Sequence, residues 1–110
     1  MKTRIWVSYS YGSWDLSFSK TFDLPFTPFF GMMITLDDDD NTIELINTDH
    51  THTIICYHVP WNYFEINVRI HWQFPVTDDE VDSILETYAE WEREDNTDIP
   101  RLKILMAAKR

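Results

Sequence analysis

A chain of 110 residues has the length of one domain, and its 44% hydrophobic and 15% aromatic content excludes intrinsic disorder, because burial of this surface offsets the entropy lost on folding. A formal net charge of -10, from 19 acids against 9 bases, opposes direct binding to nucleic acid or to anionic membranes. One cysteine excludes an internal disulfide, and without an apolar signal core or a run long enough to span a bilayer we expect a cytoplasmic protein.

Alternation with a period of two residues predicts a β-hairpin at the start of the chain. From Ile5 to Tyr11 the odd-numbered residues are apolar or aromatic, and from Trp14 to Leu24 the apolar residues are even-numbered. The two-residue loop Gly12-Ser13 is typical of a tight turn, and it pairs Tyr11 with Trp14. With this register both apolar sets lie on one face of the hairpin.

The next segment, residues 24–30, is apolar but contains Pro25 and Pro28. Each proline lacks the N–H that an inner strand needs, so this segment is not an inner strand. We favour a crossover that plugs the core, and an exposed binding loop is the alternative.

Four further strands follow, over about residues 30–36, 42–45, 51–59 and 64–74. The last is the clearest, because six apolar residues from Phe64 to Phe74 alternate with polar ones. Consecutive strands with short connections usually lie side by side. The sequence therefore predicts a six-stranded antiparallel meander over about residues 3–74.

The pattern changes to a helical period after Pro75. Thr77 can cap a helix, with Glu80 completing the capping box, and an apolar stripe runs from Val81 to Trp91. We expect one amphipathic helix over about residues 78–95, packed on one face of the sheet, and a short helix or edge strand over about 99–108. The predicted class is α+β, with residues 1–110 forming a single domain.

The acids are concentrated in two places, the turn 37–40 and the helix with its continuation to Asp98. The meander places both near Trp61 and Tyr63, which are residue types that dominate interface energies. A surface of one charge sign speeds encounter with a partner of the opposite sign. The predicted partner-binding residues are Asp37, Asp38, Asp39, Asp40, Trp61, Tyr63, Glu86, Glu90, Glu94 and Asp95.

This surface predicts a small, non-enzymatic inhibitor that covers the basic surface of a larger protein, such as a nuclease, a toxin or a nucleic-acid-binding complex. In charge and size it is comparable to immunity proteins and to phage anti-defence proteins, some of which imitate the charge of DNA. No catalytic residue is predicted.

Histidines support a second hypothesis. His50 and His52 share the parity of one strand, and the predicted register sets His52 opposite His71 on the next. Three such side chains form a geometry that zinc accepts with its fourth position open, as in a metal-dependent enzyme or sensor. The competing interpretation is an ordinary polar outer face without a cofactor.

A third hypothesis is an oligomeric structural subunit whose apolar sheet edges pair with other copies.

Overall fold

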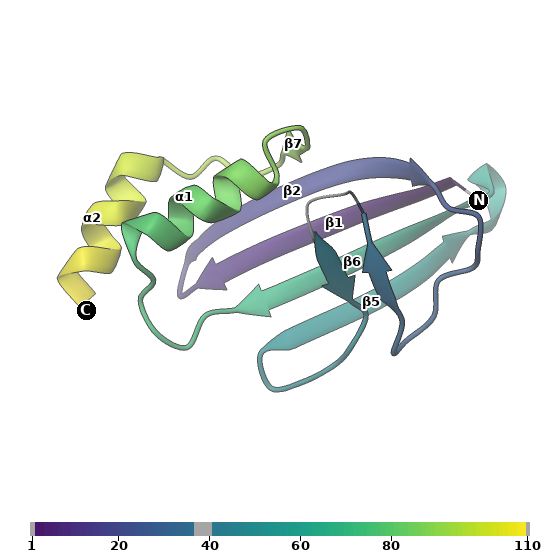
Figure 1. The fold of residues 1–110 in the computed structure, drawn as a ribbon, viewed down its shortest axis with the longest axis horizontal. Coiled ribbons are helices and arrows are strands. Elements are labelled where there is room, and N and C mark those ends of the chain that lie inside the picture. The colour runs from purple at the N-terminus through teal and green to yellow at the C-terminus, as the bar shows by residue number, and fades with distance from the viewer. Residues whose placement is uncertain (1, 37–40, 110) are drawn as a thin grey trace.

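The computed structural model describes residues 2–36 and 41–109, which form an α+β fold with two sheets and two α-helices (Figure 1). The larger sheet has the strand order β5-β6-β1-β2-β7, and the smaller is the hairpin β3-β4. In chain order the elements are β1 (Lys2–Tyr11), β2 (Trp14–Asp23), β3 (Met33–Thr35), β4 (Thr42–Glu44), β5 (Thr51–His58), the 3₁₀ turn η1 (Val59–Trp61), β6 (Tyr63–His71), α1 (Asp78–Thr87), β7 (Glu92–Arg93) and α2 (Ile99–Lys109).

The first hairpin has the predicted register. Tyr11 lies opposite Trp14 and Val7 opposite Phe18, and the turn between the strands places Gly12 at a left-handed φ of 58° that glycine adopts without strain. Ile5, Val7, Leu16 and Phe18 are buried on the shared face. Alternation in the sequence was therefore sufficient to define this half of the core.

The predicted six-stranded antiparallel meander is wrong. β6 lies beside β1 and runs parallel to it, with Ile66 opposite Ile5, and β5 pairs with β6 on the outside. β3 and β4 pair only with each other. The parity of each strand is as predicted, but the order of the strands is not.

Coverage of the core face explains why β3 and β4 leave the main sheet. A ten-residue helix is about 15 Å long, whereas a ten-residue strand such as β1 is about 33 Å long, so α1 covers only part of the face. Ile34, Ile43 and Leu45 of the β3-β4 region complete the same buried cluster as Val81 of α1. Figure 1 shows the hairpin and α1 on the same side of the sheet.

The C-terminal elements differ from the predicted boundaries. α1 starts at Asp78 as expected but ends at Thr87, well before residue 95, and Glu92–Arg93 then pairs with β2 as a short edge strand. This strand supplies partners for backbone groups that β2 would otherwise leave open. The tail is a helix, α2, which buries Leu102 and Met106.

The two ends of the sheet carry different features. Because β6 is parallel to β1, η1 lies at the end where β1 begins, opposite the Gly12-Ser13 turn (Figure 1). α2 lies near that turn, where Arg101 is over the ring of Trp14. The Gly12-Ser13 turn and η1 therefore lie at opposite ends of the sheet, where the predicted meander would place them at the same end, and the turn 37–40 lies outside the described residues.

Candidate functional site

The acidic residues of α1 are all exposed. Its first turn carries Asp78, Asp79 and Glu80, and Thr77 accepts a hydrogen bond from the Glu80 N–H at 3.2 Å. Acids there stabilise a helix, because they lie near the positive end of its dipole. Glu86 lies in the last turn, where no base is present and a negative charge is unfavourable. Helix stability therefore does not explain Glu86.

Glu86 and Glu90 line an open depression of about 300 Å³ between the C-terminal end of α1 and the sheet. Apolar side chains from three separate segments also line it, namely Phe22, Leu36 and Trp91. The ring of Trp91 meets that of Phe22 edge-on, with 5.5 Å between centroids. This combination of two carboxylates with an aromatic wall is suited to a cationic side chain with an apolar stem.

Lys20 is a base that lines the same depression. Its amine lies 5.6 Å from the centroid of the Phe22 ring, and no ion pair joins it to an acid among residues 2–36 and 41–109. The depression thus already holds one cation against its aromatic wall.

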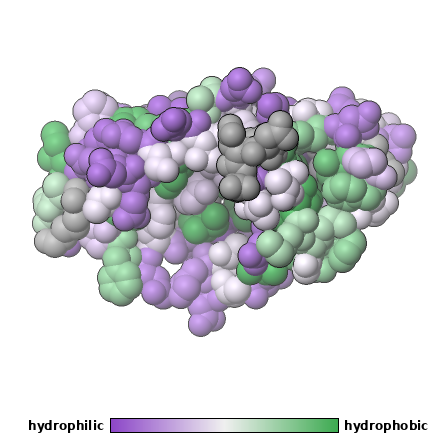
Figure 2. All heavy atoms as spheres, viewed as in Figure 1, coloured by the Kyte–Doolittle hydropathy of each residue, from purple (hydrophilic) through white to green (hydrophobic). Residues whose placement is uncertain are grey.

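Most other bases of the described chain are engaged inside the molecule. Arg4 pairs with Glu92 at 3.1 Å. Lys103 pairs with Asp82 at 2.6 Å, and the hydrogen bond to Asp82 raises the pKa of Lys103. Arg101 and Lys109 lie over aromatic rings. The carboxylates of Glu86 and Glu90, by contrast, have no ion pair with a base in the described ranges. Figure 2 shows hydrophilic side chains gathered over α1.

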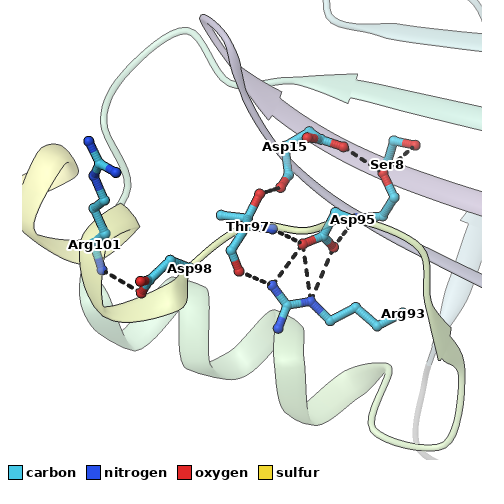
Figure 3. Close-up of polar contacts among 8 residues, drawn as sticks. Ser8, Asp15, Arg93, Asp95, Thr97, Asp98 and Arg101 are labelled. Carbon is cyan, nitrogen blue, oxygen red and sulfur yellow. Dashed lines mark hydrogen bonds and ion pairs between the residues drawn. The ribbon is translucent and has the colours of Figure 1, made fainter.

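Two of the predicted partner-binding acids, Glu94 and Asp95, are used within the chain (Figure 3 for Asp95). Glu94 accepts from the Ser19 hydroxyl at 2.6 Å and lies 3.4 Å from Arg4. The Asp95 side chain is 0% exposed and accepts from Arg93 at 2.7 Å and from the Ser17 N–H at 2.8 Å. The Asp95 carboxylate is therefore enclosed within the chain, whereas the Glu94 side chain is still 28% exposed, and its binding role stays a prediction.

Burial tends to raise the pKa of Asp95, but hydrogen bonds from Arg93 and from the N–H groups of Ser17 and Thr97 outweigh it, so the pKa lies below its ordinary value. The carboxylate is therefore ionised at neutral pH and fixes the segment 93–97 against β2. Its role is structural.

Trp61 and Tyr63 lie at the end of the sheet where β6 begins. Trp61 is 70% exposed, and Tyr63 is half-buried with its ring stacked on His58 at 4.7 Å between centroids. Arg4, which lies opposite Glu65 in the sheet, pairs with Glu92 at 3.1 Å and with Glu94 at 3.4 Å. One guanidinium balances at most one of these negative charges, and the acidic rim expected around Trp61 and Tyr63 stays a prediction, because the turn 37–40 lies outside the described residues.

The three predicted zinc ligands are only partly brought together. The observed register places His52 opposite Arg69, two residues from the predicted pairing, and leaves 6.2 Å between the ring centroids of His52 and His71. The ring of His50 contacts Gln73 instead. No group of three histidine, cysteine, aspartate or glutamate side chains suited to a metal ion is found among the described residues. The metal hypothesis stays a prediction, and elemental analysis of untagged protein tests it.

Two surface features differ from the favoured predictions. The rings of Phe26, Phe29 and Phe30 are exposed, so the favoured core plug holds only for Leu24 and Pro28, which are buried. Apolar side chains gather over this connection and β3 in Figure 2. The depression beside Glu86 was not predicted. Phe22, Leu36 and Trp91 line it but are far apart in the sequence, so no local sequence pattern indicates that they meet.

Comparison with family models, with curated proteins and with solved structures finds no match for this chain. Neither described helix is long and apolar enough to span a membrane. The interpretation of the site therefore depends on its geometry.

Proposed function

We propose that this chain is a non-enzymatic binding protein that covers a basic surface of a larger partner and inhibits it. The observation that carries the proposal is the depression lined by Glu86 and Glu90, whose carboxylates have no basic partner among residues 2–36 and 41–109. An arginine or lysine of the partner would place its stem against Trp91 and its charge between the two acids.

Electrostatics supports the same proposal over a longer range. The net charge of -10 would attract a basic surface during diffusional encounter, and the acids of the first turn of α1 extend the negative surface away from the depression. The exposed Trp61 could add a separate apolar anchor, although it lies outside the depression. Nucleases, toxins and nucleic-acid-binding complexes carry basic surfaces of the required kind.

The test compares two double variants that each remove two exposed acids. Glu86→Gln with Glu90→Gln alters the depression, whereas Glu44→Gln with Asp49→Asn changes the net charge equally in the β4-β5 region. Immobilised wild-type chain is used to capture proteins from a lysate of its host, and the captured species are eluted with increasing salt. We expect the first variant to lose the basic partner and the second to retain it. Equal capture by both variants would exclude the depression as the binding site.

Removal of the Lys20 amine, which lies in the depression itself, should have the opposite effect on binding. Lys20→Gln leaves the aromatic wall without its own amine, so affinity for a basic partner should rise. Weaker capture by Lys20→Gln would contradict the proposed insertion of a partner cation.

A further inference from the structure

β5 is an outer strand of the large sheet and pairs with β6 on one side only. On the other side the Thr53 N–H donates to the side chain of Asn47 at 2.8 Å, which covers the first half of the edge. The N–H and C=O of alternate residues in an antiparallel strand point to the same side, so those of Ile55 and Tyr57 point away from β6 as well. These four groups have no hydrogen-bond partner in the described ranges.

The edge also lacks acidic residues, lysine and arginine, and part of it is apolar. Residues 50–64 contain no aspartate, glutamate, lysine or arginine, in a chain whose net charge is -10. Ile54 is 56% exposed, and Val59 and Trp61 of the adjoining 3₁₀ turn are exposed too. Proteins usually block a free edge with a lysine, a proline or a bulge, and the eight residues of β5 have none of these.

The opposite edge of the same sheet is protected. There β7 has only two residues, Glu92 and Arg93, and both are exposed and charged. One edge therefore disfavours further pairing, while the other presents unpaired backbone groups beside apolar side chains.

We propose that β5 pairs with β5 of a second copy of this chain, which joins the two five-stranded sheets into one of ten strands. A two-fold axis at Cys56 sets Ile55 of each copy opposite Tyr57 of the other, so that their outward N–H and C=O groups form four hydrogen bonds.

Charge favours a second copy at this edge. Two acidic molecules repel each other over most of their surface, and the uncharged segment 50–64 allows the closest approach with the least repulsion. The strand order places Glu92 four strands away, at about 19 Å within each copy. The charged β7 strands of the two copies would therefore lie at the far edges of the joined sheet.

Cys56 is the only cysteine and is exposed, which provides a native probe of the pairing. In the proposed register the two Cys56 Cα atoms are about 4.5 Å apart, a distance that a short bismaleimide bridges. We expect a cross-linked dimer on treatment of wild-type protein, a dimer mass in light scattering, and slowed hydrogen exchange at the amides of Ile55 and Tyr57 as concentration rises. A monomer at all concentrations, or a dimer without the Cys56 cross-link, would overturn the proposal.

A matched pair of variants tests the edge itself. Ile54→Lys introduces a charge beside the pairing groups, and Ile104→Lys makes the same change on α2, where Ile104 is 69% exposed. The dimer dissociation constant should rise at least roughly tenfold for Ile54→Lys and stay unchanged for Ile104→Lys. A dimer equally weakened by both variants would contradict pairing through β5. The Cys56 cross-link on wild-type protein tests the same pairing without any substitution.

Discussion

Asp95 shows how one residue can have a different role from the one its charge suggests. Its sequence position, in a run of acids, predicted a solvent-facing carboxylate, but the side chain is buried with Arg93 and with the N–H groups of Ser17 and Thr97. Nothing local distinguishes such an acid from its exposed neighbours, because the group it binds on β2 is 78 residues away in sequence.

The variant Asp95→Asn should lower the free energy of unfolding by about 2 kcal/mol, because charged hydrogen bonds to buried groups are lost. Urea denaturation at pH 7 measures the change, with the exposed Glu90→Gln as a control that should differ little from wild type.

The pKa of Asp95 is lowered in the folded state, so the contribution of its carboxylate to the free energy of unfolding is complete above the unfolded pKa of about 3.9 and is lost as pH falls through the lower folded value. The gap between Asp95→Asn and wild type should therefore narrow below about pH 4. A gap independent of pH down to acid unfolding would contradict this assignment.

Glu86 provides the second residue-scale prediction. A negative charge in the last turn of α1 opposes the helix dipole, so Glu86→Gln should raise the free energy of unfolding by about 0.3 kcal/mol. Glu80→Gln at the other end of the same helix should lower it by about 0.5 kcal/mol, because Glu80 lies in the favourable first turn. Urea denaturation of both variants gives the signs. A destabilising effect of Glu86→Gln would mean that Glu86 contributes to the stability of α1 after all.

At the scale of elements, α2 tests which contacts hold the C-terminal segment. Leu102 and Met106 are buried, whereas Ile104 on the same helix is exposed. Leu102→Ala should lower the free energy of unfolding by about 3 kcal/mol, and Ile104→Ala should change it by less than about 0.5 kcal/mol. Thermal or urea unfolding followed by circular dichroism measures both. Similar effects of the two substitutions would mean that α2 does not dock as described.

Elements with a strong local signal were predicted well. The β1-β2 register follows from the parity of the apolar residues and a two-residue turn, and the start of α1 follows from Thr77. The end of α1 was placed too late, because Trp91 continues the helical spacing although it belongs to the turn before β7. In the structure the ring centroids of Trp91 and Tyr88 are 4.9 Å apart. Residues three positions apart can make this contact both in a helix and in a turn, so the sequence did not show where the helix ends.

At the scale of the whole molecule, parity determines the face of a strand but not its neighbours. Ile66 and Val68 are buried as alternation requires, yet they lie beside β1 in parallel and not in a meander. The strand order was also not predictable from the pattern of α1, which is too short to cover the sheet and shares the buried face with β3 and β4. The acidic depression depends on the same arrangement, so its position could not be predicted before the strand order was known.

The charge of the whole molecule gives the last prediction. With a net charge of -10 and most described bases already paired or lying over rings, the dominant interaction among surface charges is repulsion between acids. Raising the ionic strength from 0.01 M to 0.15 M shortens the screening length from about 30 Å to about 8 Å, so the melting temperature at pH 7 should rise. The double variant Glu86→Gln with Glu90→Gln should show a smaller rise, because two unpaired acids are gone. A melting temperature that falls with salt would mean that the ion pairs of Arg4, Arg93 and Lys103 outweigh the repulsion, and the acidic surface would then be balanced internally and not reserved for a partner.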